Sequence, residues 1–233
     1  MGIRNLALCL LSIRHRPEIS HWSTIKVSHK SEASTQESFE PIDYAAKAYT
    51  LIKTALDTYD PHTILIERQR YRTAGGAAIQ EWTVRVNMLE SMFHATLHTF
   101  SQIHACDFDV YSVSPRKVTQ LWLGEGRQKL NARETKFAKM DVAQRIVNGK
   151  ETDVSIDIIG QAKTISELFA GESKAGPQKL DDLADSMLQG LAWWKWNLNR
   201  SKMLDEILNG GFKDENNKSK SKTRRRQVTI VAN

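Results

Sequence analysis

The sequence predicts a mixed α/β domain in which helices flank a β-sheet. Two β-rich segments, residues 3–13 and 18–27, lie close together in the chain, as expected for an antiparallel hairpin. Residues 63–67 form a short strand that is apolar on both faces, which is typical of a position in the middle of a sheet. Helical spacing of apolar residues follows the hairpin and again follows residues 63–67. Strands that alternate with helices in this way imply a sheet covered by helices.

Each element has its own signal. The hairpin turns through His15-Arg16-Pro17, and a polar loop then leads to a helix over residues 42–59. Gly75-Gly76 breaks the chain before a long helix over residues 77–100. A strand over residues 108–113 stops at Ser114-Pro115. Helices are predicted over residues 115–123, 133–147 and 181–208, with a linker at 171–179. We expect residues 1–209 to form one domain and residues 210–233 to form a basic, disordered tail.

Composition excludes several classes of protein. The 233 residues are 40% hydrophobic and 26% charged, which is ordinary for a globular domain. No run of 18 apolar residues is present, so no membrane span is predicted. Cys9 and Cys106 are the two cysteines, and they provide neither a disulfide framework nor a zinc-binding pattern.

The formal charge of +6 is unevenly distributed. Residues 114–150 hold nine basic and three acidic residues, whereas residues 151–185 hold eight acidic and three basic ones. A further seven basic residues lie within 213–226. A basic segment beside an acidic one suits a metal-dependent nucleic-acid enzyme, because cations contact phosphates and acids hold metal. Two solvated faces would produce the same pattern.

The acidic residues that suggest a metal site lie on two distant elements. Glu67 ends the apolar strand, and Asp181, Asp182 and Asp185 lie in the first turns of the last helix. Residues three or four apart share a helix face, so two carboxylates can project together and hold Mg²⁺ or Mn²⁺. Close acids without metal would repel one another and have raised pKa values. Acids at a helix N-terminus also favour the macrodipole, and Glu67 could instead pair with a neighbouring arginine.

Two blocks of sequence resemble a known family. Ile64-Leu-Ile-Glu67-Arg-Gln-Arg-Tyr-Arg-Thr73 and Lys179-Leu-Asp-Asp-Leu-Ala-Asp-Ser-Met-Leu-Gln189 are similar to the fungal mitochondrial Holliday-junction resolvases, which are RuvC-like enzymes of the RNase H-like superfamily. The resemblance implies an RNase H-like mixed sheet flanked by helices. It also implies a Mg²⁺- or Mn²⁺-dependent endonuclease that cleaves four-way DNA junctions as a homodimer in mitochondria. Glu67, Asp182 and Asp185 would be catalytic metal ligands, with Asp181 assisting.

The first motif of the family is incomplete in this chain. Met1-Gly-Ile-Arg-Asn5 resembles the end of that motif, in which an aspartate precedes x-Gly-x-x-Asn. The aspartate and the first central strand would lie before Met1, as would a mitochondrial targeting segment. We therefore expect an N-terminally truncated domain whose sheet largely lacks its first central strand. We also expect the chain as given to be inactive.

Basic residues supply the predicted DNA contacts. The arginines after Glu67 could reach phosphates beside the cleaved bond, and a second group could contact the junction arms. The predicted DNA-binding residues are Arg68, Gln69, Arg70, Arg72, Arg116, Lys117, Arg127, Lys129, Arg133 and Lys136, with Lys139 on the same segment. Each group could instead be a solvated loop or face.

Other features leave alternatives open. Trp193, Trp194 and Trp196 could stack on bases, although helical spacing favours a role in the core or an interface. His94 and His98 lie four apart without the glutamate of a metalloprotease motif, so a packed or surface pair is favoured. The run of arginines at 224–226 could be a nuclear signal, a DNA-binding arm or an inert tail. The rival functions are a noncatalytic junction- or nucleic-acid-binding protein and a metal-dependent RNase H-like enzyme that acts on another substrate, such as RNA.

Overall fold

The computed structural model describes residues 5–13, 16–27, 40–69, 80–103, 107–124, 130–151, 153–170, 180–211 and 226–232, with the backbone alone at 209–211 and 226–232. The strands are β1 (Leu6–Ile13), β2 (Pro17–Ile25), β3 (Thr63–Glu67), β4 (Asp109–Val113), β5 (Asp157–Ile158) and β6 (Arg226–Ala232). The helices are α1 (Pro41–Tyr59), α2 (Glu81–Ile103), α3 (Pro115–Leu123), α4 (Ala132–Val147), α5 (Ala162–Ala170) and α6 (Leu180–Gly211).

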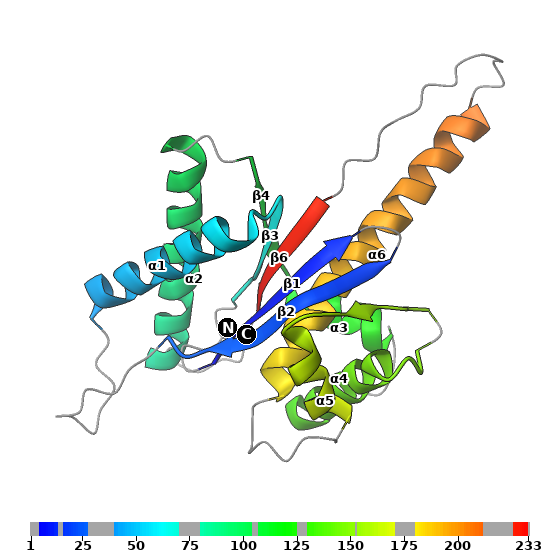
Figure 1. Ribbon diagram of the computed structural model, residues 1–233, viewed down its shortest axis with the longest axis horizontal. Helices are drawn as coiled ribbons and strands as arrows, with labels where there is room; N and C mark the ends of the chain where they lie inside the picture. Colours follow the sequence, from blue (N-terminus) through cyan, green and yellow to red (C-terminus); the bar gives the residue numbers. More distant parts are fainter. Residues whose placement is uncertain are drawn as a thin grey trace.

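A single mixed sheet organises the described residues. Its strand order is β4-β3-β6-β1-β2-β5, and β1 and β2 form the predicted antiparallel hairpin. β3 pairs in parallel with β4, and β2 pairs in parallel with the two-residue β5. Figure 1 shows the sheet between one layer containing α1 and α2 and another containing α3 to α6. The fold is therefore the mixed α/β arrangement that the sequence predicts.

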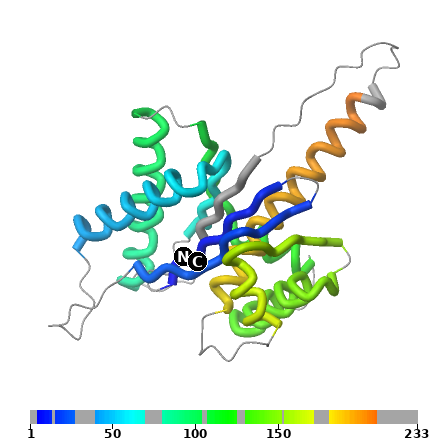
Figure 2. The backbone as a smooth tube through the Cα atoms, viewed as in Figure 1, coloured from blue at the N-terminus to red at the C-terminus, as the bar shows by residue number. Residues whose placement is uncertain are grey.

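The two faces of the sheet bury separate apolar cores. In β1, Leu6 and Leu8 pack with α1 and α2, whereas Cys9 and Leu11 pack with α3 to α6. This division follows from the two-residue period of a strand, which sends successive side chains to opposite faces. The same alternation governs β3, where Leu65 faces the α6 side. Figure 2 shows α1 and α2 crossing on one side, with α6 running along the other.

The centre of the sheet differs from the prediction. β6, from the far end of the chain, lies between β1 and β3, antiparallel to β1 and parallel to β3. A strand that preceded β1 through a tight turn would have this position and direction, because hairpin neighbours are antiparallel. The predicted vacancy at the first central strand is thus filled by residues 226–232. The expectation of disorder over the whole of 210–233 is wrong for these residues.

Most predicted helices and strands are confirmed within a few residues. α4 begins with a capping box, in which the Asn131 side chain accepts from the Glu134 backbone N–H and Glu134 accepts in return. α5 and β5, which are short, were not predicted. No helix in the described part of the chain is long and apolar enough to cross a membrane.

Candidate metal and nucleic-acid site

Glu67 lies at the end of β3 on the α6 side of the sheet. Leu65, two residues earlier, packs into the core that contains α6, so strand alternation directs Glu67 to the same face. Glu67 is opposite Val113 of β4 in the parallel pairing, and only 9% of its surface is exposed. A carboxylate that is this deeply buried requires a hydrogen-bonding or cationic environment.

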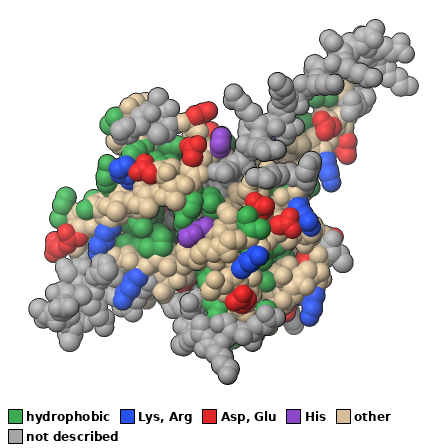
Figure 3. Space-filling view, in the orientation of Figure 1, with side chains coloured by type: hydrophobic (Ala, Val, Ile, Leu, Met, Phe, Trp, Pro, Cys, Tyr) green, Lys and Arg blue, Asp and Glu red, His purple; other side chains and the backbone are tan. Residues whose placement is uncertain are grey.

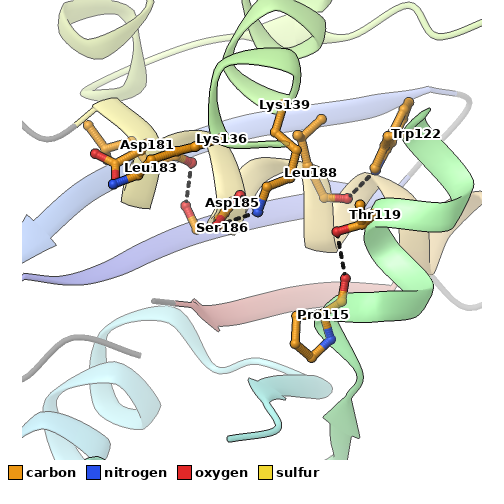
Figure 4. A network of polar contacts seen from close by, with 10 residues as sticks. All are labelled: Pro115, Thr119, Trp122, Lys136, Lys139, Asp181, Leu183, Asp185, Ser186 and Leu188. Carbon is orange, nitrogen blue, oxygen red and sulfur yellow. Dashed lines mark hydrogen bonds and ion pairs between the residues drawn. The ribbon is translucent and has the colours of Figure 1, made fainter. Parts of the chain in front are cut away.

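Tryptophans from two other elements fix the start of α6. The indole N–H of Trp22, on β2, donates to the Leu183 carbonyl at 3.0 Å and to Ser186 Oγ at 3.2 Å. From α3, the Trp122 indole N–H donates to the Leu188 carbonyl at 2.9 Å. Figure 4 shows the contact from Trp122 beside the acids of α6. The first three turns of α6 are therefore held against both β2 and α3.

Lysines of α4 face the aspartates of α6. Lys139 Nζ lies 2.6 Å from Asp185 Oδ1 and 2.7 Å from Oδ2, and Lys136 pairs with Asp181. Both pairs are visible in Figure 4, with the lysines projecting from α4 toward α6. The Lys139 side chain is 15% exposed, whereas that of Lys136 is 56% exposed. The Asp185 pair is therefore the more shielded of the two.

The pKa of Asp185 agrees in part with the prediction that close acids have raised pKa values. Burial raises the pKa of Asp185, with Asp181 adding to the rise, while Lys139 opposes it through charge and a hydrogen bond. The predicted rise is thus present, but its largest cause is desolvation and not repulsion between acids. The hydrogen bond to Asp181 raises the pKa of Lys136, and nearby carboxylates add to that effect.

The donor chemistry of these residues fits a divalent cation. Carboxylate oxygens are the ligands that Mg²⁺ and Mn²⁺ prefer, and the half-buried Asp185 is already matched with a cation, the Lys139 ammonium. Among the described residues, however, no three acidic, histidine or cysteine side chains converge into a metal-holding group. Lysines satisfy Asp181 and Asp185 in this arrangement, so these two acids could bind metal once Lys136 and Lys139 turn away.

The predicted DNA-binding residues divide into three sets. Arg68 is exposed just beyond β3, and the Gln69 backbone N–H donates to Glu90 Oε2 of α2 at 3.0 Å. Arg116 and Lys117 are exposed on α3, and Arg133 is exposed on α4, whereas Lys136 is engaged by Asp181. The predicted contacts at Arg70, Arg72, Arg127 and Lys129 lie outside the described residues. On the face drawn in Figure 3, lysines and arginines are dispersed among acids rather than gathered in one patch.

Comparisons with known proteins identify the family. Residues 1–203 match the family described as "Mitochondrial resolvase Ydc2 / RNA splicing MRS1". The chain belongs to this family. It is 30% identical over 205 residues to the mitochondrial Cruciform cutting endonuclease 1 of Schizosaccharomyces pombe. The alignment covers 84% of this chain and 76% of that protein. The Saccharomyces cerevisiae protein of the same name is 22% identical over 248 aligned positions, covering 89% and 70%.

A solved structure supports the same placement in the resolvase family. The crystal structure of the yeast mitochondrial Holliday junction resolvase Ydc2 superposes with a TM-score of 0.62 at 29% identity, covering 84% of this chain and 75% of that one. The resemblance drawn from the two sequence blocks is confirmed. The RNase H-like, RuvC-like fold class is confirmed with it.

Sequence reasoning did not foresee the lysine partners of the acids. Lys136 and Lys139 were assigned to DNA binding, and nothing assigned Trp22 to the anchoring of α6. The sequence did contain a signal for this pairing. Lys136 and Lys139 lie three apart on one helix, and Asp181 and Asp185 lie four apart on another, so each pair shares one face of its helix. Pairing between helices that are distant in sequence requires the tertiary structure, so that signal alone could not identify the partner helix.

Proposed function

We propose that this chain is a metal-dependent endonuclease that resolves four-way DNA junctions in mitochondrial recombination. The observation that carries the proposal is the family match over residues 1–203, together with Glu67 and the acids of α6 on one side of the sheet. The relatives named above are a mitochondrial Holliday junction resolvase and two mitochondrial cruciform-cutting endonucleases.

Glu67, Asp182 and Asp185 would hold Mg²⁺ or Mn²⁺, with Asp181 assisting. When bound, the metal would activate a water for attack on the phosphodiester and stabilise the departing oxygen. The protein itself supplies the low-dielectric surroundings of these acids. Burial keeps Glu67 and Asp185 in a low-dielectric setting, where their attraction to cations is strengthened.

Basic side chains near the acids would position the DNA. Arg68 directly follows Glu67 and is exposed, so it can contact a phosphate close to the cleaved bond. Arg116 and Lys117 project from α3, which begins two residues after β4 ends beside Glu67. Lys139 neutralises Asp185 before the substrate arrives and would release that acid when a metal binds.

A second candidate function is nucleic-acid binding without cleavage. The family description includes an RNA-splicing protein beside the resolvase, so the same fold serves more than one nucleic-acid task. A metal-dependent enzyme that acts on RNA is the third candidate.

A homodimer would supply the two sites needed for symmetric cleavage of a junction. The long helix α2 has an apolar stripe that could serve a dimer interface, but this stripe packs into the core with α1 through Leu89, Phe93 and Leu97. The outer half of α6 offers another surface, because Met203, Leu204, Ile207 and Leu208 are exposed there. Sedimentation of the chain and of a Leu204→Glu, Leu208→Glu variant tests whether this surface joins two copies.

Cleavage assays separate the three candidates. The chain is incubated with Mg²⁺ and a mobile four-way junction, the linear duplex of one arm, or an RNA–DNA hybrid. A resolvase cuts the junction in preference to the others. Asp185→Asn abolishes cutting but retains binding, and Asp205→Asn, on the exposed part of α6, behaves as the parent.

Each other outcome identifies a rival. Junction binding without cleavage, both by this chain and by a version extended with Ile-Asp before Met1, identifies the noncatalytic protein. Cleavage by the extended version alone identifies the missing aspartate as the cause. Equal or better cleavage of the hybrid identifies the enzyme that acts on RNA.

A further inference from the structure

A groove of about 600 Å³ opens at Arg68, the residue after Glu67, between the ends of β3 and β4 and the helices α3 and α6. Its wall contains two cations, Arg68 and Lys117, and two indoles, Trp193 and Trp196. Neutral polar side chains, among them Ser114 and Gln120, complete the lining. The volume falls within the range of small-molecule sites, and the mixture of charge and aromatic surface matches the chemistry of a nucleotide.

The groove is continuous with the candidate catalytic position. The Arg68 backbone N–H donates to the Val113 carbonyl at 2.8 Å, and Val113 is the residue paired with Glu67. Both Arg68 and Val113 line the groove. A ligand in the groove would therefore lie directly next to the strand end that carries Glu67.

The two tryptophans of the groove differ from those that fix α6. The indole N–H groups of Trp22 and Trp122 are used in hydrogen bonds to α6. Among the described residues, the ring nitrogens of Trp193 and Trp196 have no hydrogen-bond partner. Both side chains are half-buried, and the Trp193 ring packs against Tyr111 with 4.5 Å between centroids. Trp193 is thus held in place, and Trp196 adds a second indole to the same wall.

The cations occur where a phosphate is readily bound. Lys117 lies in the first turn of α3, whose N-cap residue, Ser114, makes no capping hydrogen bond through its side chain. Arg68 and Lys117 are both exposed. Within the described residues, neither is in an ion pair, unlike Lys136 and Lys139.

We propose that this groove binds one nucleotide of the DNA strand adjacent to the cleaved phosphodiester. The base stacks on Trp196, and its phosphate is contacted by Arg68 and Lys117. The proposal rests on the proposed function, because it assumes that DNA reaches Glu67. It assigns sequence preference at the cut to Trp196 and Gln120, which would contact the base.

The test uses junctions that carry the fluorescent base 2-aminopurine at each position near the exchange point in turn. Binding by the full chain is measured in Ca²⁺, so the result does not depend on cleavage. Trp196→Ala is compared with Trp196→Phe, which keeps an aromatic ring, and with Trp82→Ala, on α2 outside the groove. Lys117→Gln is compared with Lys163→Gln on α5 under a series of salt concentrations.

We expect the fluorescence at one position to change on binding and the change to disappear in Trp196→Ala. Affinity should fall by about 5- to 150-fold, because base stacking contributes about 1–3 kcal/mol and 1.4 kcal/mol is tenfold. Trp196→Phe should retain most of the affinity. Lys117→Gln should lower the slope of log affinity against log salt by about one, because one phosphate contact is lost.

The proposal is overturned if no position reports on Trp196, or if Trp82→Ala produces the same loss. It is also overturned if Trp196→Ala changes the sedimentation of the DNA-free protein, since the groove is then a contact between copies. Absence of cleavage in Mg²⁺ with intact fluorescence changes rejects the catalytic function and leaves the groove assignment standing.

Discussion

Replacement of Lys139 by methionine tests how the candidate site is stabilised. Methionine keeps most of the apolar length of the side chain but removes the ammonium that lies 2.6 Å and 2.7 Å from the two Asp185 oxygens. Asp185 is 29% exposed and Lys139 is 15% exposed, so the pair is shielded from water but not fully buried. The variant leaves Asp185 as an uncompensated charge.

The expected cost lies between two known regimes. Exposed ion pairs contribute about 0–1 kcal/mol, and loss of one partner from a fully buried pair costs about 3–5 kcal/mol. We therefore expect Lys139→Met to lower the free energy of unfolding by about 1–3 kcal/mol at pH 7. Lys136→Met is the matched control, because Lys136 is 56% exposed, and its loss should cost no more than about 1 kcal/mol.

The pKa shift of Asp185 determines how the stability cost of Lys139→Met changes with pH. Burial raises the pKa of Asp185 above its ordinary value of 3.8, so ionisation of this acid costs stability as the pH rises through the folded-state pKa. Lys139 opposes that rise, and its removal moves the pKa further upward. The cost of Lys139→Met should therefore be largest at neutral pH and should shrink as the pH falls toward 4.

Urea unfolding at pH 4 to 8 measures these changes in the parent, Lys139→Met, Asp185→Asn and the double variant. The double-mutant cycle isolates the pairwise energy. Equal costs for Lys139→Met and Lys136→Met would refute the reasoning. So would a cost of Lys139→Met that grows as the pH falls.

Three further changes test how the site is supported. Trp22→Phe should cost about 1–2 kcal/mol in urea unfolding, because the indole N–H no longer bonds the Leu183 carbonyl and Ser186 Oγ, and an unchanged midpoint would contradict this. Asn131→Ala should cost about 1 kcal/mol through loss of the α4 cap, whereas Asn131→Asp should cost much less. Thr229→Pro removes a backbone donor from the central strand β6 and should lower the free energy of unfolding by about 2–4 kcal/mol. Thr229→Val, the control, should be tolerated. Equal stability of the two variants would place residues 226–232 outside the sheet.

Local sequence patterns were sufficient for the elements that carry the acids. The continuous apolar run within residues 63–67, bounded by polar residues, defined β3 and placed Glu67 at its end. The spacing of Asp181 and Asp185 defined a shared helix face in the same way. These signals are local because the backbone geometry of one element sets them.

Features that depend on distant contacts were beyond local patterns. The pairing of Asp185 with Lys139 depends on how α4 packs on α6, and sequence spacing cannot define that packing. β6 had a local signal, since Val228, Thr229, Ile230 and Val231 all favour strands. The basic residues within 213–226 led instead to the interpretation of residues 210–233 as a disordered tail. Nothing in the local pattern indicated that this strand would enter the sheet between β1 and β3.

The central claim is that Glu67 and the acids of α6 hold one divalent cation together. Titration of Mn²⁺, followed by the electron paramagnetic resonance signal of the free ion, tests it without any need for cleavage. Glu67→Gln and Asp185→Asn should each weaken Mn²⁺ binding by at least about tenfold, because each removes a charged ligand, while Asp205→Asn leaves it unchanged. Binding that is lost in Asp185→Asn but unaffected by Glu67→Gln would contradict a shared site.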